Sequence, residues 1–297
     1  MSIPEGGLSE LFRTRDFPTT RYRFRFRHRE DLLLAVDASN AASTDFDKTG
    51  EIVWLVSVLT AHYLASEMAN ELKGEAILEL GAGAGLCGLA AAAVGSSLVV
   101  FTDEEEEVLS LLERNMRHVL PSCTAHVMAL SWGNASDAAL LASLTRRHRW
   151  RFIVGADVVY WSAAIAPLVE TVRALLAADG VFVLGCEWSK CRSCGPTTAY
   201  FECLGDCTAS YCPLLHADTN RVDSNLRALM AAAVAAGFDV EETDRSFSWR
   251  PDDDDAGNRN SLTADRLPHY AGNTSLMTIF RWTWRAGCGP AVDVEAT

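Results

Sequence analysis

Three glycines at alternate positions, Gly81, Gly83 and Gly85, indicate chemistry more directly than any other part of this chain. They follow the apolar run 76–80, which is typical of a buried parallel strand, and they precede an alanine-rich run that begins a helix. Glycine permits a sharp turn and lets a ligand approach the backbone without a Cβ in the way. The helix N-terminus adds free N–H groups and the positive end of a dipole. The pattern predicts a site for a nucleotide-like cofactor.

Two carboxylates near this turn bear on which cofactor it binds. The segment 83–88 fits the dinucleotide pattern, and Asp103, which follows about 20 residues later, is suited to bind ribose hydroxyls. Glu79, however, lies in the strand just before the first glycine, where its charge would repel a pyrophosphate. S-adenosyl-L-methionine instead offers an ammonium and a sulfonium at that place. The sequence therefore favours S-adenosyl-L-methionine, with a dinucleotide as the alternative.

The elements that must position these residues alternate along the chain from residue 76 onwards. Strands are expected at about 76–80, 98–102, 124–130, 151–157, 180–186, 238–243 and 274–284. Helices are expected at about 86–94, 104–118, 135–146, 164–178 and 222–236. Such alternation predicts an α/β fold with a Rossmann-like, doubly wound, seven-stranded sheet that is mostly parallel and has an antiparallel hairpin at one edge.

A segment of another kind precedes this region. Residues 21–29 alternate basic and aromatic side chains with period two, which predicts a half-buried strand with a hairpin partner at 32–36. The basic face could guide an acidic substrate, although we favour a strand edge that charge keeps soluble. The mostly apolar run 52–72 has helical spacing and is expected to pack against the sheet.

The composition narrows the class of protein. The chain has 297 residues, of which 49% are hydrophobic, so it can bury a sizeable core. Its net charge of −13 works against nucleic-acid binding, which needs a basic surface. The first residues show no apolar signal-peptide core, and the cysteines number nine, an odd count. We therefore expect no membrane association and a reducing compartment, the cytoplasm, with the nucleus as the alternative.

Five short segments together resemble a known family. They are Thr49-Gly50-Glu51-Ile52-Val53-Trp54, Glu79 to Leu86, Phe101-Thr102-Asp103, Leu130-Ser131-Trp132-Gly133 and Gly155-Ala156-Asp157-Val158-Val159-Tyr160. The resemblance extends over about 45–187 and in part over 220–284. It is to the class I, seven-strand S-adenosylmethionine-dependent methyltransferases, and within them to the methyltransferase-like protein lysine methyltransferases.

The resemblance implies an organisation, a substrate class and further site residues. Residues 1–50 would be an N-terminal extension with a β-hairpin, and 51–297 the methyltransferase domain. Trp54, Trp132 and Ala156 would line the cofactor site together with Glu79, the three glycines and Asp103. The substrate would be a protein such as a chaperone or a translation factor. The family often has Asp before the tryptophan of the third motif, where this chain has Ser131.

Asp157 and Tyr160 stand at the end of a predicted parallel strand, the edge at which α/β sheets bind ligands. A lysine amine has a pKa of about 10.4 and must lose its proton before it can attack a sulfonium methyl group. We assign Asp157 to hold the incoming amine and Tyr160 to line its channel or accept a hydrogen bond. Methyltransferases that act on planar nitrogens often have two prolines between these positions, so Val158 and Val159 favour an sp³ amine.

The segment 188–221 is a cysteine-rich insertion. Cys191, Cys194, Cys203 and Cys207 could supply four sulfur ligands to zinc, but we favour reduced thiols and expect no metal.

Rival interpretations of the whole chain are an RNA or small-molecule methyltransferase, a dinucleotide-dependent oxidoreductase, and a non-catalytic binding module with the cofactor fold.

Overall fold

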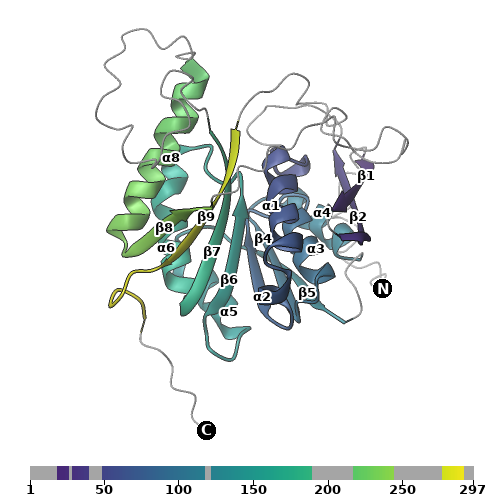
Figure 1. Ribbon diagram of the computed structural model, residues 1–297, viewed down its shortest axis with the longest axis horizontal. Coiled ribbons are helices and arrows are strands. Elements are labelled where there is room, and N and C mark those ends of the chain that lie inside the picture. Colours follow the sequence, from purple (N-terminus) through teal and green to yellow (C-terminus); the bar gives the residue numbers. More distant parts are fainter. Residues whose placement is uncertain are drawn as a thin grey trace, which may run out of the picture.

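A computed structural model describes residues 19–26, 29–39, 49–117, 122–188, 217–243 and 276–290. Seven strands form one sheet in the order β5-β4-β3-β6-β7-β9-β8 (Figure 1). The first five strands in this order, β5, β4, β3, β6 and β7, are each parallel to their neighbours. Strand β9 is antiparallel to both β7 and β8. The strands are β3 (Ala76–Leu80), β4 (Leu98–Asp103), β5 (Thr124–Ala129), β6 (Trp150–Ala156), β7 (Leu176–Trp188), β8 (Phe238–Glu242) and β9 (Leu276–Trp284). The predicted fold class, including its antiparallel edge pair, is confirmed.

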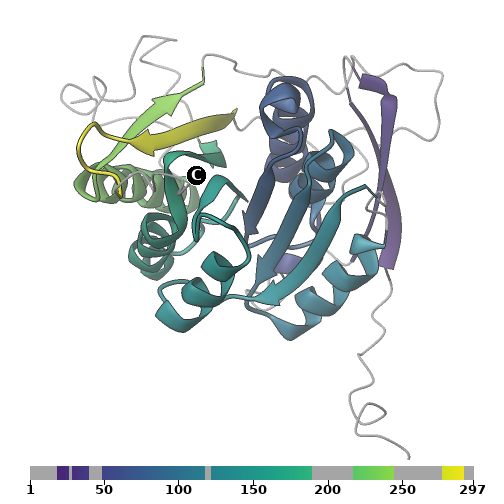
Figure 2. The same ribbon diagram turned by 90° about the horizontal axis from the view of Figure 1, so that it is seen from below.

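Helices cover both faces of this sheet, as Figure 2 shows. The helices are α1 (Leu55–Ser66), α2 (Ala69–Leu72), α3 (Leu86–Ala93), α4 (Glu106–Met116), α5 (Ala135–Ser143), α6 (Ile165–Leu175) and α8 (Ala217–Ala235), with short 3₁₀ turns η2 (Thr49–Glu51) and η3 (Ser162–Ala164). Successive side chains of a strand point to opposite faces of the sheet. Ile77 is therefore buried in the core under α1, α3 and α4, whereas Leu78 is buried in the core under α6 and α8. The two apolar layers fix the sheet between them.

The N-terminal hairpin packs on the helical layer rather than on the sheet edge. Strand β1 (Thr19–Phe26) pairs antiparallel with β2 (Arg29–Ser39). Tyr22, Phe24 and Phe26 are buried in the core that α3 and α4 share, while Arg23 is exposed. The period-two alternation therefore predicts the two faces correctly, with the aromatic face turned inwards.

Two predicted elements differ from the structure. The run 52–72 is not one helix, because α1 ends at Ser66 and α2 begins at Ala69, and the break allows both Met68 and Leu72 to be fully buried. Strand β7 begins at Leu176 instead of near residue 180, and its pairing with β6 is interrupted by a bulge before Val181. The segment 177–180 has a turn-like sequence, which conceals the earlier start of the strand.

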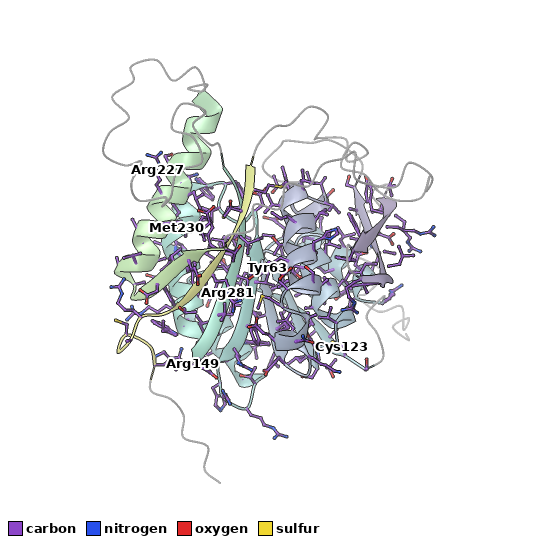
Figure 3. All side chains as sticks on the ribbon, in the orientation of Figure 1. Tyr63, Cys123, Arg149, Arg227, Met230 and Arg281 are labelled. Carbon is purple, nitrogen blue, oxygen red and sulfur yellow. The ribbon has the colours of Figure 1, made fainter. Side chains whose placement is uncertain are left out.

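A cross-element contact joins the antiparallel edge of the sheet to α1. The Arg281 guanidinium on β9 donates to the Tyr63 hydroxyl at 3.5 Å and lies 3.2 Å from the Glu71 carboxylate (Figure 3).

Among the helices within the described ranges, none has the length and apolar character needed to cross a lipid bilayer. The cysteine-rich insertion, apart from residues 188 and 217–221, lies outside the described residues.

Candidate functional site

The turn between β3 and α3 has the backbone conformation that its glycines predict. Gly81, Gly83 and Gly85 have φ angles of 59°, 52° and 83°, in the left-handed region where a side chain is strained. A Cβ added to Gly81 would lie 2.9 Å from Val158 and 3.2 Å from the Trp132 ring. The turn therefore lies directly against the segment after β6 and against the predicted adenine-side tryptophan.

Glu79 lies beneath this turn and is 3% exposed. Its Oε2 accepts a hydrogen bond of 2.8 Å from the Gly88 N–H, in the first turn of α3. Burial raises the pKa of Glu79 to about 8, although hydrogen bonds from Gly88 and Cys87 favour the ionised form. The side chain thus ties β3 to the start of α3 and holds a carboxyl group in a dry environment.

Asp103 ends β4 and meets the same turn from the neighbouring strand. Its Oδ2 accepts from the Gly83 N–H at 3.0 Å, and its Oδ1 accepts from the Glu104 N–H at 2.8 Å. Burial raises the pKa of Asp103, against the effect of these backbone hydrogen bonds. The carboxylate and the glycine turn, which the sequence predicted to act on one cofactor, are therefore in direct contact.

The segment that contains Trp54 lies on the other side of the turn. The Trp54 indole N–H donates to the Thr49 carbonyl at 2.8 Å, which closes the η2 turn. A Cβ added to Gly83 would lie 3.1 Å from the Gly50 carbonyl oxygen. The η2 turn and the glycine turn are thus packed backbone against backbone, and Trp54 enters α1 beside them.

Asn115 on α4 is a site residue that the sequence analysis did not assign. It is 1% exposed, and its Nδ2 donates to the carbonyls of Ala84 and Asp37, each at 2.9 Å. Its Oδ1 accepts from the Asp37 N–H at 2.9 Å. One buried amide therefore joins the glycine turn to strand β2. The available signal was an uncharged polar residue on the apolar side of an amphipathic helix, beside Leu111 and Leu112.

Asp157, directly after β6, has a left-handed backbone with φ of 59°. Asp tolerates this region better than most residues, and such strain concentrates at functional sites. Its N–H donates to the Gly185 carbonyl on β7 at 3.0 Å. Burial, with the nearby charge of Asp157, raises the pKa of the Cys186 thiol. Ala156 is half-buried at the end of β6, so the residues of this predicted signature share one edge of the sheet.

Ser131 takes part in a different contact from the one that an aspartate would make. The Ser131 hydroxyl donates to the Glu104 carboxylate at 2.8 Å. Glu104 follows Asp103 directly, so a carboxylate still lies beside the Trp132 segment, although it comes from the residue after β4 rather than from the segment after β5. The four cysteines considered for zinc lie outside the described residues. Within the described ranges, no group of three metal-ligating side chains could hold a metal ion.

Comparison with known proteins identifies related sequences. Residues 36–202 match a family model described as "Lysine methyltransferase". The chain is 31% identical over 151 residues to the protein N-lysine methyltransferase METTL21A of Danio rerio, covering 49% of this chain and 65% of the relative. It is 30% identical over 154 residues to the protein N-terminal and lysine N-methyltransferase EFM7 of Yarrowia lipolytica, covering 46% and 56%.

A third relative is the EEF1A lysine methyltransferase 3 of Mus musculus. The chain is 28% identical to it over 152 residues, which cover 51% of this chain and 60% of the relative. The chain therefore spans less than two thirds of the length of each of these three relatives.

Proposed function

We propose that this chain, which belongs to the lysine methyltransferase family, transfers a methyl group from S-adenosyl-L-methionine to a lysine side chain of a protein. The observation that supports the proposal best is the contact between the glycine turn and the segment after β6. Val158 lies 2.9 Å from the position of a Cβ on Gly81, so Asp157, its neighbour in sequence, stands close to the cofactor turn. A glycine turn for the cofactor that packs against the segment of the proposed amine-binding residue suits direct group transfer.

The residues of the turn fit the cofactor of this family. S-adenosyl-L-methionine, when bound, supplies an electrophilic methyl group on a sulfonium. The left-handed glycines leave the backbone open to it, and the N-terminus of α3 points at the same place. Asp103 is placed to accept from ribose hydroxyls, and Glu79 places a carboxyl group beneath the turn, where a cation favours its ionised form. Trp54, Trp132 and Ala156 complete the lining.

On the acceptor side, the chain must hold an amine that has given its proton to solvent, so that the nitrogen lone pair can form the new N–C bond as the C–S bond breaks and the thioether leaves. Asp157 binds the lysine nitrogen through its carboxylate, and the hydrogen bond from its N–H to the Gly185 carbonyl holds its left-handed backbone beside β7. Val158 and Val159 are 3% and 9% exposed and provide apolar surroundings, which lower the pKa of an amine. Tyr160, which is 42% exposed, lines the approach to this site.

The relatives support a protein substrate, because one of them is named as an EEF1A lysine methyltransferase. As the substrate we propose a translation factor first and a chaperone second. We place the reaction in the cytoplasm, with the nucleus as the alternative, because the nine cysteines suit a reducing compartment.

Label transfer tests the proposal. The purified chain is incubated with methyl-labelled S-adenosyl-L-methionine and a lysate, of which one portion is treated with protease and another with nuclease. We expect label in protein that protease removes and nuclease leaves. Label that only nuclease removes would favour an RNA substrate. Label found only in small molecules would favour a metabolite as the substrate. Binding of a nicotinamide dinucleotide without any binding of S-adenosyl-L-methionine would favour the oxidoreductase interpretation.

A further inference from the structure

Two exposed aromatic side chains directly follow the proposed amine-binding turn. Tyr160 is 42% exposed and Trp161 is 61% exposed. In the described part of the chain, the other large apolar side chains with comparable exposure are Leu33 and Leu140. An aromatic pair that is consecutive in sequence and open to solvent at the ligand edge of a sheet marks an interaction surface more strongly than isolated exposed residues do.

Contacts hold the backbone on both sides of this aromatic pair. Upstream, Val158 and Val159 are buried in the core, and the Asp157 N–H is bonded to β7. Downstream, the Trp161 carbonyl accepts from the Ala164 N–H at 3.1 Å, in the η3 turn that leads into α6. Both ends of the short segment are therefore held, and the two side chains between them are exposed to solvent.

The Trp161 ring has no structural role among the residues that the structure describes. It belongs to neither core cluster of described residues, and no ring or cation contact of it is found within them. Packing therefore gives no reason for a tryptophan here. Recognition does, because tryptophan presents a wide, rigid surface, and its ring face attracts cations.

We propose that Trp161, together with Tyr160, is the docking surface for the lysine-bearing segment of the substrate protein. This inference rests on the proposed function. The surface begins three residues after Asp157, so a segment that lies across it would bring a lysine to that carboxylate. The net charge of −13 favours a basic segment over a nucleic acid, whose bases could also stack on an indole.

Steady-state kinetics with matched variants test this docking. The probe is the protein that labels most strongly in the lysate, purified. Trp161→Ala should raise its KM about tenfold while kcat and the cofactor Kd stay close to those of the unchanged chain. Trp161→Phe should restore most of the affinity because it keeps an aromatic face. Leu140→Ala, which removes a side chain that is 56% exposed on α5, is the control and should leave KM unchanged.

The outcomes separate docking from function. An unchanged KM in Trp161→Ala, alongside normal transfer by the parent chain, would overturn the docking and leave the function intact. A fall in kcat alone would also overturn it, because the ring would then act at the chemical step. Loss of binding to a single-stranded oligonucleotide in Trp161→Ala, with protein KM unchanged, would assign the surface to nucleic acid. Absence of protein methylation by the parent chain would overturn both proposals.

Discussion

The Asp103 carboxylate accepts a hydrogen bond of 3.0 Å from the Gly83 N–H, across 20 residues of sequence. Its other oxygen accepts from Glu104, so one side chain fixes the end of β4 against the glycine turn. A carboxylate oxygen has further lone pairs, so this arrangement leaves Asp103 able to accept from ribose hydroxyls as well. We therefore expect Asp103 to couple the shape of the turn to its affinity for the cofactor.

Replacement of Asp103 tests this coupling. Asp103→Ala should weaken S-adenosyl-L-methionine binding by about 1.5–3 kcal/mol, roughly 10-fold to 150-fold, because a charged acceptor is lost. Asp103→Asn keeps one acceptor oxygen and should weaken binding less. Titration calorimetry measures both. Unchanged affinity in Asp103→Ala would show that this residue only shapes the turn.

Glu79 should make stability depend on pH. Its pKa in the folded chain is about 8, against an ordinary value of 4.5. Because the folded value is the higher one, the stability from Glu79 is complete below about pH 4.5 and is lost as the pH rises through about 8. Urea unfolding between these limits should show a decline that Glu79→Gln, which cannot ionise, reduces. If the free energy of unfolding declines equally with pH in both proteins, Glu79 is not a buried protonated carboxyl group.

Asn115 should stabilise both the N-terminal hairpin and the glycine turn. Asn115→Ala leaves the Ala84 carbonyl and the Asp37 backbone groups without their partner, so we expect a loss of about 2–4 kcal/mol in the free energy of unfolding. We also expect weaker cofactor binding, because the turn loses an anchor. Asn115→Asp keeps the acceptor but removes both donated bonds. If its cofactor affinity equals that of the parent chain, the bond to Ala84 does not support the site.

Asp157 should matter for transfer and not for cofactor binding. Asp157→Asn preserves a residue type that tolerates the left-handed backbone, so it should fold normally. We expect its transfer rate to fall about 100-fold or more, since the amine loses its charged partner. Thermal unfolding and calorimetry serve as controls. Full turnover by Asp157→Asn would remove Asp157 from the proposed mechanism. Weakened cofactor binding in this variant would instead indicate that Asp157 binds the cofactor rather than the amine.

The sequence predicts the sheet well because its signals are local. The apolar run 76–80, the glycine turn and the alternation in 21–26 each have a period or spacing that is read directly from the chain. The Asn115 contacts were not predictable in this way, because Asp37 is 78 residues distant in sequence. The partner of Glu79 was also missed, since a carboxylate before a glycine turn suits a ligand and a helix N-terminus equally well.

The position of the transferred methyl group tests the central claim most directly. The most strongly labelled lysate protein is purified, methylated by the chain and by Asp157→Asn in parallel, digested, and sequenced by tandem mass spectrometry. The account predicts a methyl group on a lysine ε-nitrogen, present with the parent chain and nearly absent with the variant. A methyl group on histidine or glutamine, or equal lysine methylation by both proteins, would contradict it.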